Sequence, residues 1–304
     1  MKRHYLALVI AALAFASCYE EPVSRAAPGQ PRYLIEDSAD PLDHAIYEIH
    51  RKTGVHVLYA YQLNDYLWDL GSLRNSANRL TMQADRAVLL QGMQYLDKVL
   101  FGIYPDAFKS AFFPIKVFLA DSIDVDGTTA REDLISASGR EYIAVGRLRS
   151  GAIPSTAEAL RQATGTLNAY LWANIIVKNR LLALPETFAE LSSAFYGQNY
   201  RYVKGQQQGV PAANIPYPTR EQLMDEGFWN IDPNNSLNLP IPTSYAIMPT
   251  YEGDVYQFIE AIITLDNDEL DALAEGRAKL KAKCDILLQA IKEQCGIDLQ
   301  TIGK

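Results

Sequence analysis

A helical period dominates the stretch from residue 155 to residue 188. Its apolar side chains recur at steps of three and four, as on one face of a helix, at Leu160, Ala163, Leu167, Leu171 and Ile175. Ser155 precedes Glu158 by three positions, which is the spacing of a capping box at a helix start. The pattern predicts one long helix over residues 155–183, a break at Pro185 and a return to helix at Phe188.

The other elements divide into an early part with strands and a late part with helices. Runs rich in β-branched and aromatic residues predict strands over 55–61, 113–119 and 142–145, and amphipathic runs predict helices over 41–52 and 81–99. Later, helices are predicted over 255–263 and from a cap at Asp266 to about residue 294, where Gly296 ends the pattern. This order predicts an α+β fold with a small mixed β-sheet and a helical C-terminal half.

Residues 196–244 have no regular period and combine aromatic rings with amides, glycine and proline. Flat rings beside amides and hydroxyls suit the stacking of sugars or the binding of an extended peptide. We therefore expect binding side chains at Tyr196, Tyr200, Tyr202 and Trp229. The alternative is an irregular connection that these rings hold against the core.

Residues 1–18 have the pattern of an export signal. Lys2 and Arg3 supply the positive start, and residues 6–15 form an apolar run that is too short to span a bilayer. Small residues then precede Cys18, which resembles the cleavage site of bacterial lipoproteins, where the cysteine becomes the acylated N-terminus. An ordinary signal peptide cut near Ala16 is the alternative.

The residues after Cys18 predict where the mature chain is anchored. Glu20 and Glu21 follow it directly and resemble the surface-export signal of Bacteroidetes lipoproteins. Residues 19–32 are rich in proline and predict a flexible tether, which leaves 33–304 as a single domain. We expect a bacterial outer-membrane lipoprotein attached by a lipid on Cys18, and its exposure at the cell surface stays open.

Composition and charge exclude several classes of partner and site. The 304 residues are 48% hydrophobic and 21% charged, with a formal net charge of -8, so nucleic acid is not an expected partner. Cys284 and Cys295 are eleven positions apart on one helical pattern, about 16 Å along its axis, which is too far for a disulfide. No GxSxG, GxGxxG, P-loop or CxxC motif supports a serine hydrolase, a dinucleotide-binding protein or a thiol oxidoreductase.

Two weaker patterns concern metal ions. Residues 122–127 with Asp133 partly match a calcium-binding loop, although a turn after a strand explains the same residues. The mature chain has three histidines, His44, His50 and His56, and the first two face different sides of one helix. We expect surface or half-buried histidines and predict no metal site.

Several short pieces stand in a characteristic order along the chain. They are Pro41-Leu42-Asp43, Val55-His56-Val57-Leu58-Tyr59, Phe113-Pro114-Ile115-Lys116-Val117-Phe118-Leu119, Gly227-Phe228-Trp229, Ser244-Tyr245-Ala246, Gly276-Arg277-Ala278-Lys279-Leu280 and Gly296-Ile297-Asp298-Leu299. Together they resemble the zinc-binding metallopeptidase family of Bacteroidetes lipoproteins. The resemblance covers most of the mature chain at low identity, and it implies a zincin-like domain.

The resemblance also implies where a zinc site would lie. Members carry HExxH on the long helix, where two histidines four apart bind zinc and the glutamate activates water. Here the matching positions carry Trp172 and Ile176 for the histidines and Ala173 for the glutamate. Of the acidic pattern that supplies the family's third ligand, the matching run keeps only Glu260. No histidine follows His56, so the resemblance implies a degenerate member with no zinc site, no catalytic residue and no cofactor.

The sequence therefore favours a cell-envelope lipoprotein that resembles metallopeptidases and binds a peptide, a glycan or a partner lipoprotein without hydrolysing it. Two alternatives stay open. One is an active peptidase or glycosidase with a carboxylate site around Glu260, to which Glu252 and Asp254 are close in sequence. The other is an accessory lipoprotein of a glycan-uptake system, favoured by the acidic residues after Cys18 and by the aromatic segment.

Overall fold

The structure is a computed structural model that describes residues 32–67, 78–125, 134–229 and 247–302. Contacts divide the chain into two compact units, Met1–Leu34 and Ile35–Lys304. All helices and strands of the described residues lie in the second unit. The expected export signal over 1–18 and nearly all of the expected tether lie outside the described residues.

Five strands of the described chain form a small mixed sheet, which confirms the predicted fold class. They are β1 (His56–Leu58), β2 (Asn78–Met82), β3 (Lys116–Val125), β4 (Ser136–Ser138) and β5 (Tyr142–Val145). The order is β1-β3-β5-β4, and β2 also pairs with β3. β1 and β5 run parallel to β3, whereas β2 is antiparallel to β3 and β4 is antiparallel to β5. Strand β5 has its predicted bounds.

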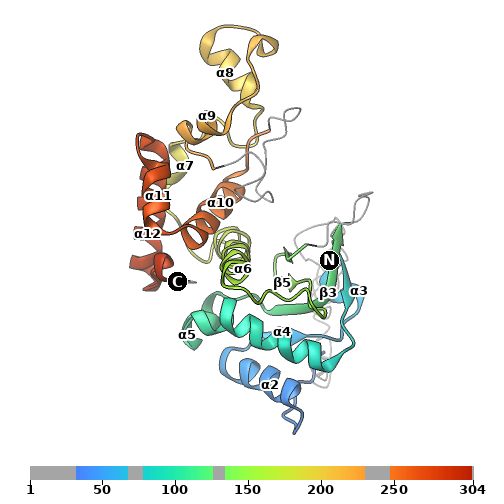
Figure 1. Cartoon of the computed structure of the whole chain (residues 1–304). Coiled ribbons are helices and arrows are strands. Elements are labelled where there is room, and N and C mark those ends of the chain that lie inside the picture. Colours follow the sequence, from blue (N-terminus) through green and yellow to red (C-terminus); the bar gives the residue numbers. More distant parts are fainter. Residues whose placement is uncertain (1–31, 68–77, 126–133, 230–246, 303–304) are drawn as a thin grey trace, which may run out of the picture. The chain divides into compact units, whose positions relative to one another are not determined.

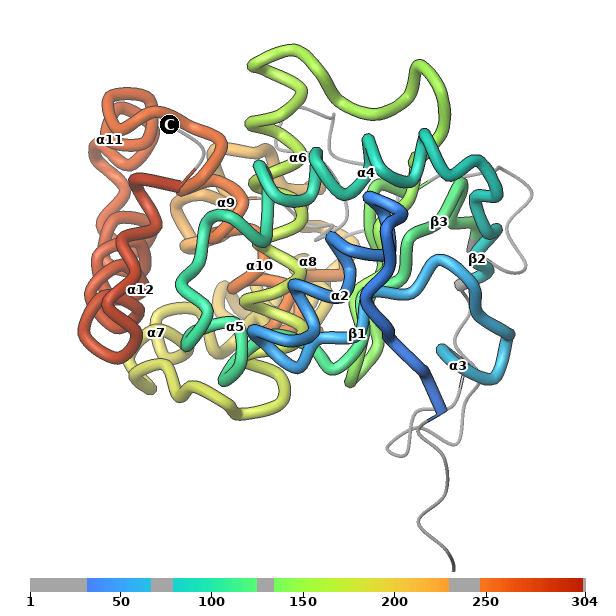
Figure 2. Tube along the Cα trace, turned by 90° about the horizontal axis from the view of Figure 1, so that it is seen from below, coloured from blue at the N-terminus to red at the C-terminus, as the bar shows by residue number. Residues whose placement is uncertain are grey.

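The N-terminal helices are α2 (Pro41–Thr53), α3 (Leu63–Leu67), α4 (Arg86–Val99) and α5 (Asp106–Phe112), with a 3-10 turn at Phe101–Ile103. α2 and α4 lie side by side (Figures 1 and 2). The predicted helix over 41–52 is confirmed as α2, which ends at Gly54 with φ of 76°. The predicted helix over 81–99 is wrong at its start, because residues 81–82 belong to β2 and the carboxylate of Asp85 caps α4.

The long central helix begins as α6 (Ala157–Ala169) and continues as a π-helix, η2 (Tyr170–Val177). Its N-cap is Thr156 rather than Ser155, so the predicted start was one residue early. The predicted end at residue 183 is wrong, because the chain leaves the helix after η2 and turns through Arg180 at φ of 59°. π-Helical turns are rare and widen the helix locally.

Helices also form the later part of the described chain. They are α7 (Glu186–Glu190), α8 (Tyr200–Gln208), α9 (Arg220–Asp225), α10 (Tyr251–Thr264), α11 (Asn267–Ala274) and α12 (Ala278–Cys295), with 3-10 turns η3 (Ala212–Asn214) and η4 (Leu299–Thr301). The region predicted as irregular thus contains short helices before residue 230. Asp266 and Gly296 do cap the last stretch, but Gly276 at φ of 74° divides it into α11 and α12.

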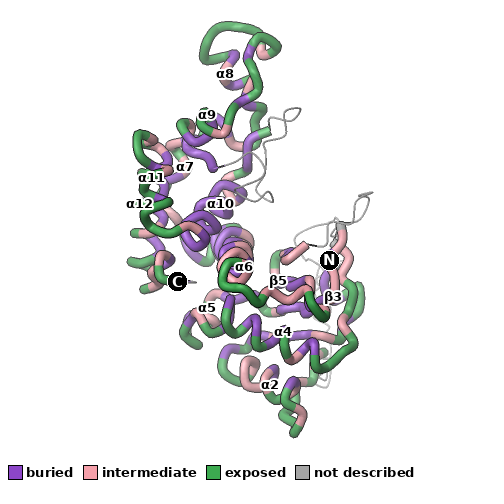
Figure 3. Tube along the Cα trace, in the orientation of Figure 1, coloured by how far each residue is buried: buried purple, intermediate pink, exposed green. Residues whose placement is uncertain are grey.

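The main hydrophobic core joins the sheet to η2, α10 and α12. Helix α10 is buried along most of its length (Figure 3). A separate cluster lies around α8 and α9, and its members are Phe195, Tyr200, Val203, Ile215, Leu223, Phe228 and Met248. We call the segment from Phe195 to Phe228, together with Met248, the α8 lobe.

Helices α6 and α10 approach each other closely at Gly165. A β-carbon at this position would overlap the methyl carbon of Thr264 and lie 3.3 Å from the carbonyl oxygen of Glu260. The Thr264 hydroxyl meanwhile donates to that same carbonyl oxygen at 2.7 Å. The missing side chain at residue 165 therefore lets the two helices pack at this distance.

We predict that Gly165→Ala lowers the free energy of unfolding by about 1–3 kcal/mol, because the added methyl overpacks the α6–α10 contact. Urea denaturation measures the change. Thr264→Ser keeps the hydroxyl and removes the opposing methyl, so it should restore most of the loss when combined with Gly165→Ala. If Gly165→Ala costs the same in both backgrounds, overlap with Thr264 is not the cause.

Candidate functional site

The three positions that the family resemblance assigns to zinc binding and catalysis lie in the core. Trp172, Ala173 and Ile176 on η2 are fully buried. The Trp172 ring packs against Phe108 of α5 with centroids 5.5 Å apart. Its Nε1–H donates to the hydroxyl of Tyr104 at 2.9 Å. The Trp172 ring thus fills space between the long helix and the α4–α5 segment.

A buried hydrogen-bond network continues from Trp172. The Tyr104 hydroxyl donates to Asn168 Oδ1 at 2.7 Å, and Asn168 Nδ2 donates to the carbonyl oxygens of Val99 at 2.9 Å and Thr164 at 2.7 Å. Such satisfied networks stabilise a buried polar group where it lies. An indole, a methyl and an aliphatic chain offer no lone pair to a metal, so the residues at these positions do not fit a zinc ion.

Glu260 on α10 is the acidic residue that matches the family pattern, and its partners are on α6 and α10. Its Oε1 accepts from the hydroxyl of Thr166 at 3.0 Å and from that of Tyr256 at 3.3 Å. Burial raises the pKa of the Glu260 carboxyl to about 7, although both hydrogen bonds lower it. The carboxyl therefore takes up a proton near neutral pH.

The side chains around Glu260 are largely aromatic, and a single layer of them separates it from solvent. The ring of Tyr256 packs edge-on against Tyr170 with centroids 5.2 Å apart. Tyr170 and Thr166 are half-buried, whereas Tyr256 and Glu260 are buried. The carboxyl thus lies beneath a half-exposed face of the long helix. Trp172 makes its contacts with Tyr104 and Phe108 instead, so the structure does not join the assigned helix positions and Glu260 into one polar site.

The carboxylates near Glu260 in sequence do not form a facing pair with it. Asp254 is six positions away on the same helix, about 240° around the axis. Its Oδ2 accepts from Lys283 at 2.6 Å and from the hydroxyl of Tyr196 at 2.7 Å. Glu252 is eight positions from Glu260 on the same helix, about 12 Å along its axis, and Asp254 is committed to a buried ion pair. The geometry therefore does not support the alternative of a hydrolase with paired carboxylates around Glu260, Glu252 and Asp254.

Most of the aromatic residues expected to bind a ligand belong to the interior, which corrects that expectation. Trp229 is fully buried against Phe258, with centroids 5.8 Å apart, and Tyr200 is buried and stacks on Phe195 at 5.8 Å. Tyr196 is half-buried, with its hydroxyl bound to Asp254. Trp229 belongs to the main core and Tyr200 to the cluster of the α8 lobe.

Tyr202 remains accessible, and a second tyrosine of the α8 lobe is exposed as well. Tyr202 is 53% exposed and Tyr217 is 42% exposed. Gln206 donates to the Tyr202 hydroxyl at 2.8 Å, and the guanidinium of Arg201 lies 4.6 Å from the centroid of the Tyr217 ring. The Tyr202 hydroxyl is therefore held by the Gln206 amide, and the Arg201 guanidinium covers one face of the Tyr217 ring.

No three His, Cys, Asp or Glu side chains gather into a metal-binding group in the described part of the chain. The rings of His50 and His56 lie together with centroids 4.3 Å apart, and His44 is bound to Asp37 at 2.7 Å. The cysteines of α12 are free thiols. Most of the candidate calcium loop, residues 126–133, lies outside the described residues.

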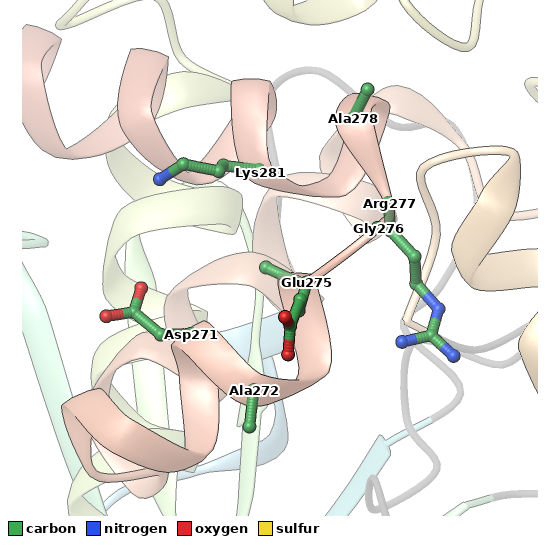
Figure 4. Close-up of a pocket in the computed structure, with 8 residues that line it drawn as sticks. Asp271, Ala272, Glu275, Gly276, Arg277, Ala278 and Lys281 are labelled. Atoms are coloured by element: carbon green, nitrogen blue, oxygen red, sulfur yellow. The ribbon is translucent and has the colours of Figure 1, made fainter.

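A surface pocket of about 740 Å³ lies at the corner between α11 and α12 (Figure 4). Charged residues of both signs line it, namely Asp271, Glu275, Arg277 and Lys281. Two of them are engaged elsewhere, because Arg277 donates to the Leu273 carbonyl and Lys281 pairs with Asp285. The mixed charge of the pocket gives no preference for an anion or a cation.

None of the described helices is long and apolar enough to cross a bilayer.

Sequence reasoning missed two groups of residues at these sites. The spacing of Tyr256 and Glu260 on one helix could have suggested their contact. Thr166 gives no such indication, because it is 94 positions from Glu260. The pairing of Lys283 with Asp254 was also missed, since a lysine in an amphipathic helix ordinarily reaches solvent.

Comparison with known proteins supports the fold alone. No protein-family model matches the chain, and no curated protein sequence matches it. A solved structure of a candidate zinc-binding metallo-peptidase from Bacteroides caccae is similar, with a TM-score of 0.53 at 10% sequence identity. The match covers 89% of this chain and 93% of that chain. The chain therefore has a metallopeptidase-like fold, with a distant relationship to that protein.

We predict a pH dependence of stability that belongs to Glu260. Its pKa of about 7 in the folded protein lies above the ordinary value of 4.5, so the folded state binds more protons than the unfolded state between these values. Its stabilisation is complete below pH 4.5 and is lost as the pH rises through 7, by about 3 kcal/mol in all. Glu260→Gln keeps a side-chain oxygen that accepts both hydrogen bonds, and it removes the carboxyl that titrates.

Denaturation of wild type and Glu260→Gln across this pH range measures the effect. The difference between the two curves isolates Glu260, because other groups such as His56 titrate in both proteins. Parallel curves would contradict a raised pKa at Glu260.

Proposed function

We propose that this protein is a lipid-anchored binding protein of the bacterial cell envelope, with a metallopeptidase-like fold and no hydrolytic activity of the metallopeptidase kind. One observation carries the proposal. Trp172, Ala173 and Ile176, at the positions that the family resemblance assigns to zinc binding and catalysis, are packed into the core. Replacement of polar ligands by buried apolar groups favours the fold, since each large side chain contributes about 1.5–3 kcal/mol on burial.

The state of Glu260 supports the same proposal. A carboxyl that is buried and half-protonated near neutral pH is a weak ligand for a divalent cation, because metal binding requires the deprotonated form. Its two hydroxyl donors also occupy Oε1. Glu260 therefore acts as a hydrogen-bond acceptor between α6 and α10.

For the ligand we infer a glycan, bound at the α8 lobe. The support is the two exposed rings of the lobe, Tyr202 with the Gln206 amide at its hydroxyl and Tyr217 with the Arg201 guanidinium over one face. Apolar faces of sugars stack on such rings while their hydroxyls bond to amides and guanidinium groups. A peptide or a partner lipoprotein would contact the same exposed side chains, but its binding would depend less on hydrogen bonds with the Gln206 amide.

Purified protein tests the function in two measurements. We predict that it contains no stoichiometric zinc and leaves casein and peptide substrates intact, because the zinc positions lack donors. We predict also that it binds members of a glycan array, and that Tyr202→Ala lowers this binding at least tenfold, a typical loss for one stacked ring. Leu63→Ala, at a 48% exposed side chain on helix α3, is the matched surface control.

Three outcomes would count against the proposal. Stoichiometric zinc with chelator-sensitive cleavage would overturn the non-hydrolytic role. Glycan binding that is unchanged in Tyr202→Ala would remove the α8 lobe as the site. Binding to a peptide array in place of the glycan array would retain the binding role and replace the ligand class.

The anchor is proposed on the sequence alone. Small residues precede Cys18, and a positive start and a short apolar run precede them. Metabolic labelling with a radioactive fatty acid should mark the wild-type protein and should fail to mark Cys18→Ala. Label that persists in Cys18→Ala would place the lipid on another residue, and a wild-type protein without label would indicate an ordinary signal peptide.

A further inference from the structure

Lys283 and Asp254 form an ion pair from which solvent is excluded. Both side chains are 0% exposed, and the distance from Lys283 Nζ to Asp254 Oδ2 is 2.6 Å. Lys283 is on α12 and Asp254 is in the first turns of α10. Burial of both charges is costly unless the pair is neutralised or fully hydrogen-bonded. This pair satisfies only part of that requirement, because Asp254 Oδ1 is buried with no hydrogen-bond partner.

Aromatic rings surround the amine. The Lys283 Nζ lies between 4.6 and 5.6 Å from four ring centroids, those of Phe188, Tyr196, Phe228 and Phe258. These rings come from four separate segments of the chain. We call them, with the two charged residues, the lysine cage. They exclude water from both reacting groups, which removes the hydration that would hold them as separate ions.

Two further groups form hydrogen bonds with the ion pair. The Tyr196 hydroxyl donates to Asp254 Oδ2 at 2.7 Å, the oxygen that also accepts from Lys283. The Lys283 amine donates to the Gly227 carbonyl at 3.0 Å. Burial raises the pKa of Asp254 and lowers the pKa of Lys283, although each partner opposes the shift of the other. Both shifts favour the neutral acid and the neutral amine, which can react with each other.

We propose that the lysine cage forms an intramolecular amide bond between Lys283 Nζ and Asp254 Cγ. The proton of the ion pair first moves from Nζ to Oδ2 along their hydrogen bond. The neutral amine then attacks Cγ, the Nζ–Cγ bond forms, and the Cγ–Oδ2 bond breaks. Oδ2 leaves as water with its own proton and a second proton from the amine. Asp254 Oδ1 becomes the carbonyl oxygen of the amide, and no oxidant or co-reactant takes part.

The contacts of the cage fit this direction of reaction. Tyr196 donates to the oxygen that leaves, which makes that oxygen a better leaving group. The Gly227 carbonyl oxygen accepts a hydrogen bond from Nζ and can accept the same bond from the N–H of the product amide. Oδ1, unpartnered as a carboxylate oxygen, carries less charge as an amide oxygen and is easier to bury. Tyr196 is a catalytic residue of this step, since it touches the reacting carboxyl.

Peptide mapping by mass spectrometry tests the proposal on the folded full chain. After prolonged incubation and digestion, the peptides that contain Asp254 and Lys283 should be recovered joined, lighter than their sum by one water. Glu226 supplies an internal control, because it pairs with Lys204 and Lys279 at 2.7 Å each in a site that solvent reaches. No joined peptide should form there.

Two variants distinguish the bond from a plain ion pair. The digest of Lys283→Met should contain only separate peptides with the masses that its sequence gives. In Asp254→Asn the two peptides should still be joined, with loss of ammonia in place of water. Tyr196→Phe should slow the joining at least tenfold. Separate recovery of both wild-type peptides would overturn the proposal and leave a non-covalent ion pair; this outcome does not depend on whether any variant folds.

Discussion

Helices α6 and α10 lie against each other at a point where residue 165 has no side chain, and much of the structure depends on that contact. The methyl of Thr264 occupies the space that a β-carbon at Gly165 would need. One residue further along α6, Thr166 then reaches the carboxyl of Glu260 at 3.0 Å. The separation of the helices thus determines both the burial of Glu260 and its hydrogen bonding. A wider separation would admit water and return the carboxyl towards its ordinary pKa.

The part of the long helix around Asn168 and Trp172 has a further neighbour, the α4–α5 segment, and a different chemistry. There Trp172, Tyr104 and Asn168 form a hydrogen-bonded chain inside apolar packing. The π-helical turns of η2 begin next to this point, and they carry Trp172, Ala173 and Ile176, the positions that the sequence resemblance assigns to zinc binding and catalysis. The long helix therefore packs against both neighbours, and the carboxyl of Glu260 is held at its contact with α10. This division is the physical basis for the proposed loss of hydrolysis with retention of the fold.

Local sequence patterns correctly predicted the elements whose ends are determined by residues next to those ends. Asp40 and Gly54 enclose α2, β5 has its predicted bounds, and Gly296 ends α12. Elements whose ends depend on distant packing were misjudged. Residues 81–82 form a strand because β3 pairs with them, although helix α4 begins four residues later.

The candidate site was predictable only in part for the same reason. The absence of histidine after residue 56 is visible in the sequence, as is the carboxyl at Glu260. Which aromatic rings are accessible depends on the fold, so Tyr202 stays exposed while Tyr200, two positions earlier on the same helix, is buried. Lys283 follows the polar pattern of a surface helix and yet ends in the lysine cage, because α10 places a carboxyl opposite it.

We propose that this chain has no zinc site. X-ray data collected at the zinc absorption edge, from crystals of the exported protein grown with zinc, test it most directly. The structure predicts no anomalous peak within bonding distance of Glu260 or of helix η2. A strong peak coordinated by Glu260 would contradict the claim and identify ligands that replace the histidines.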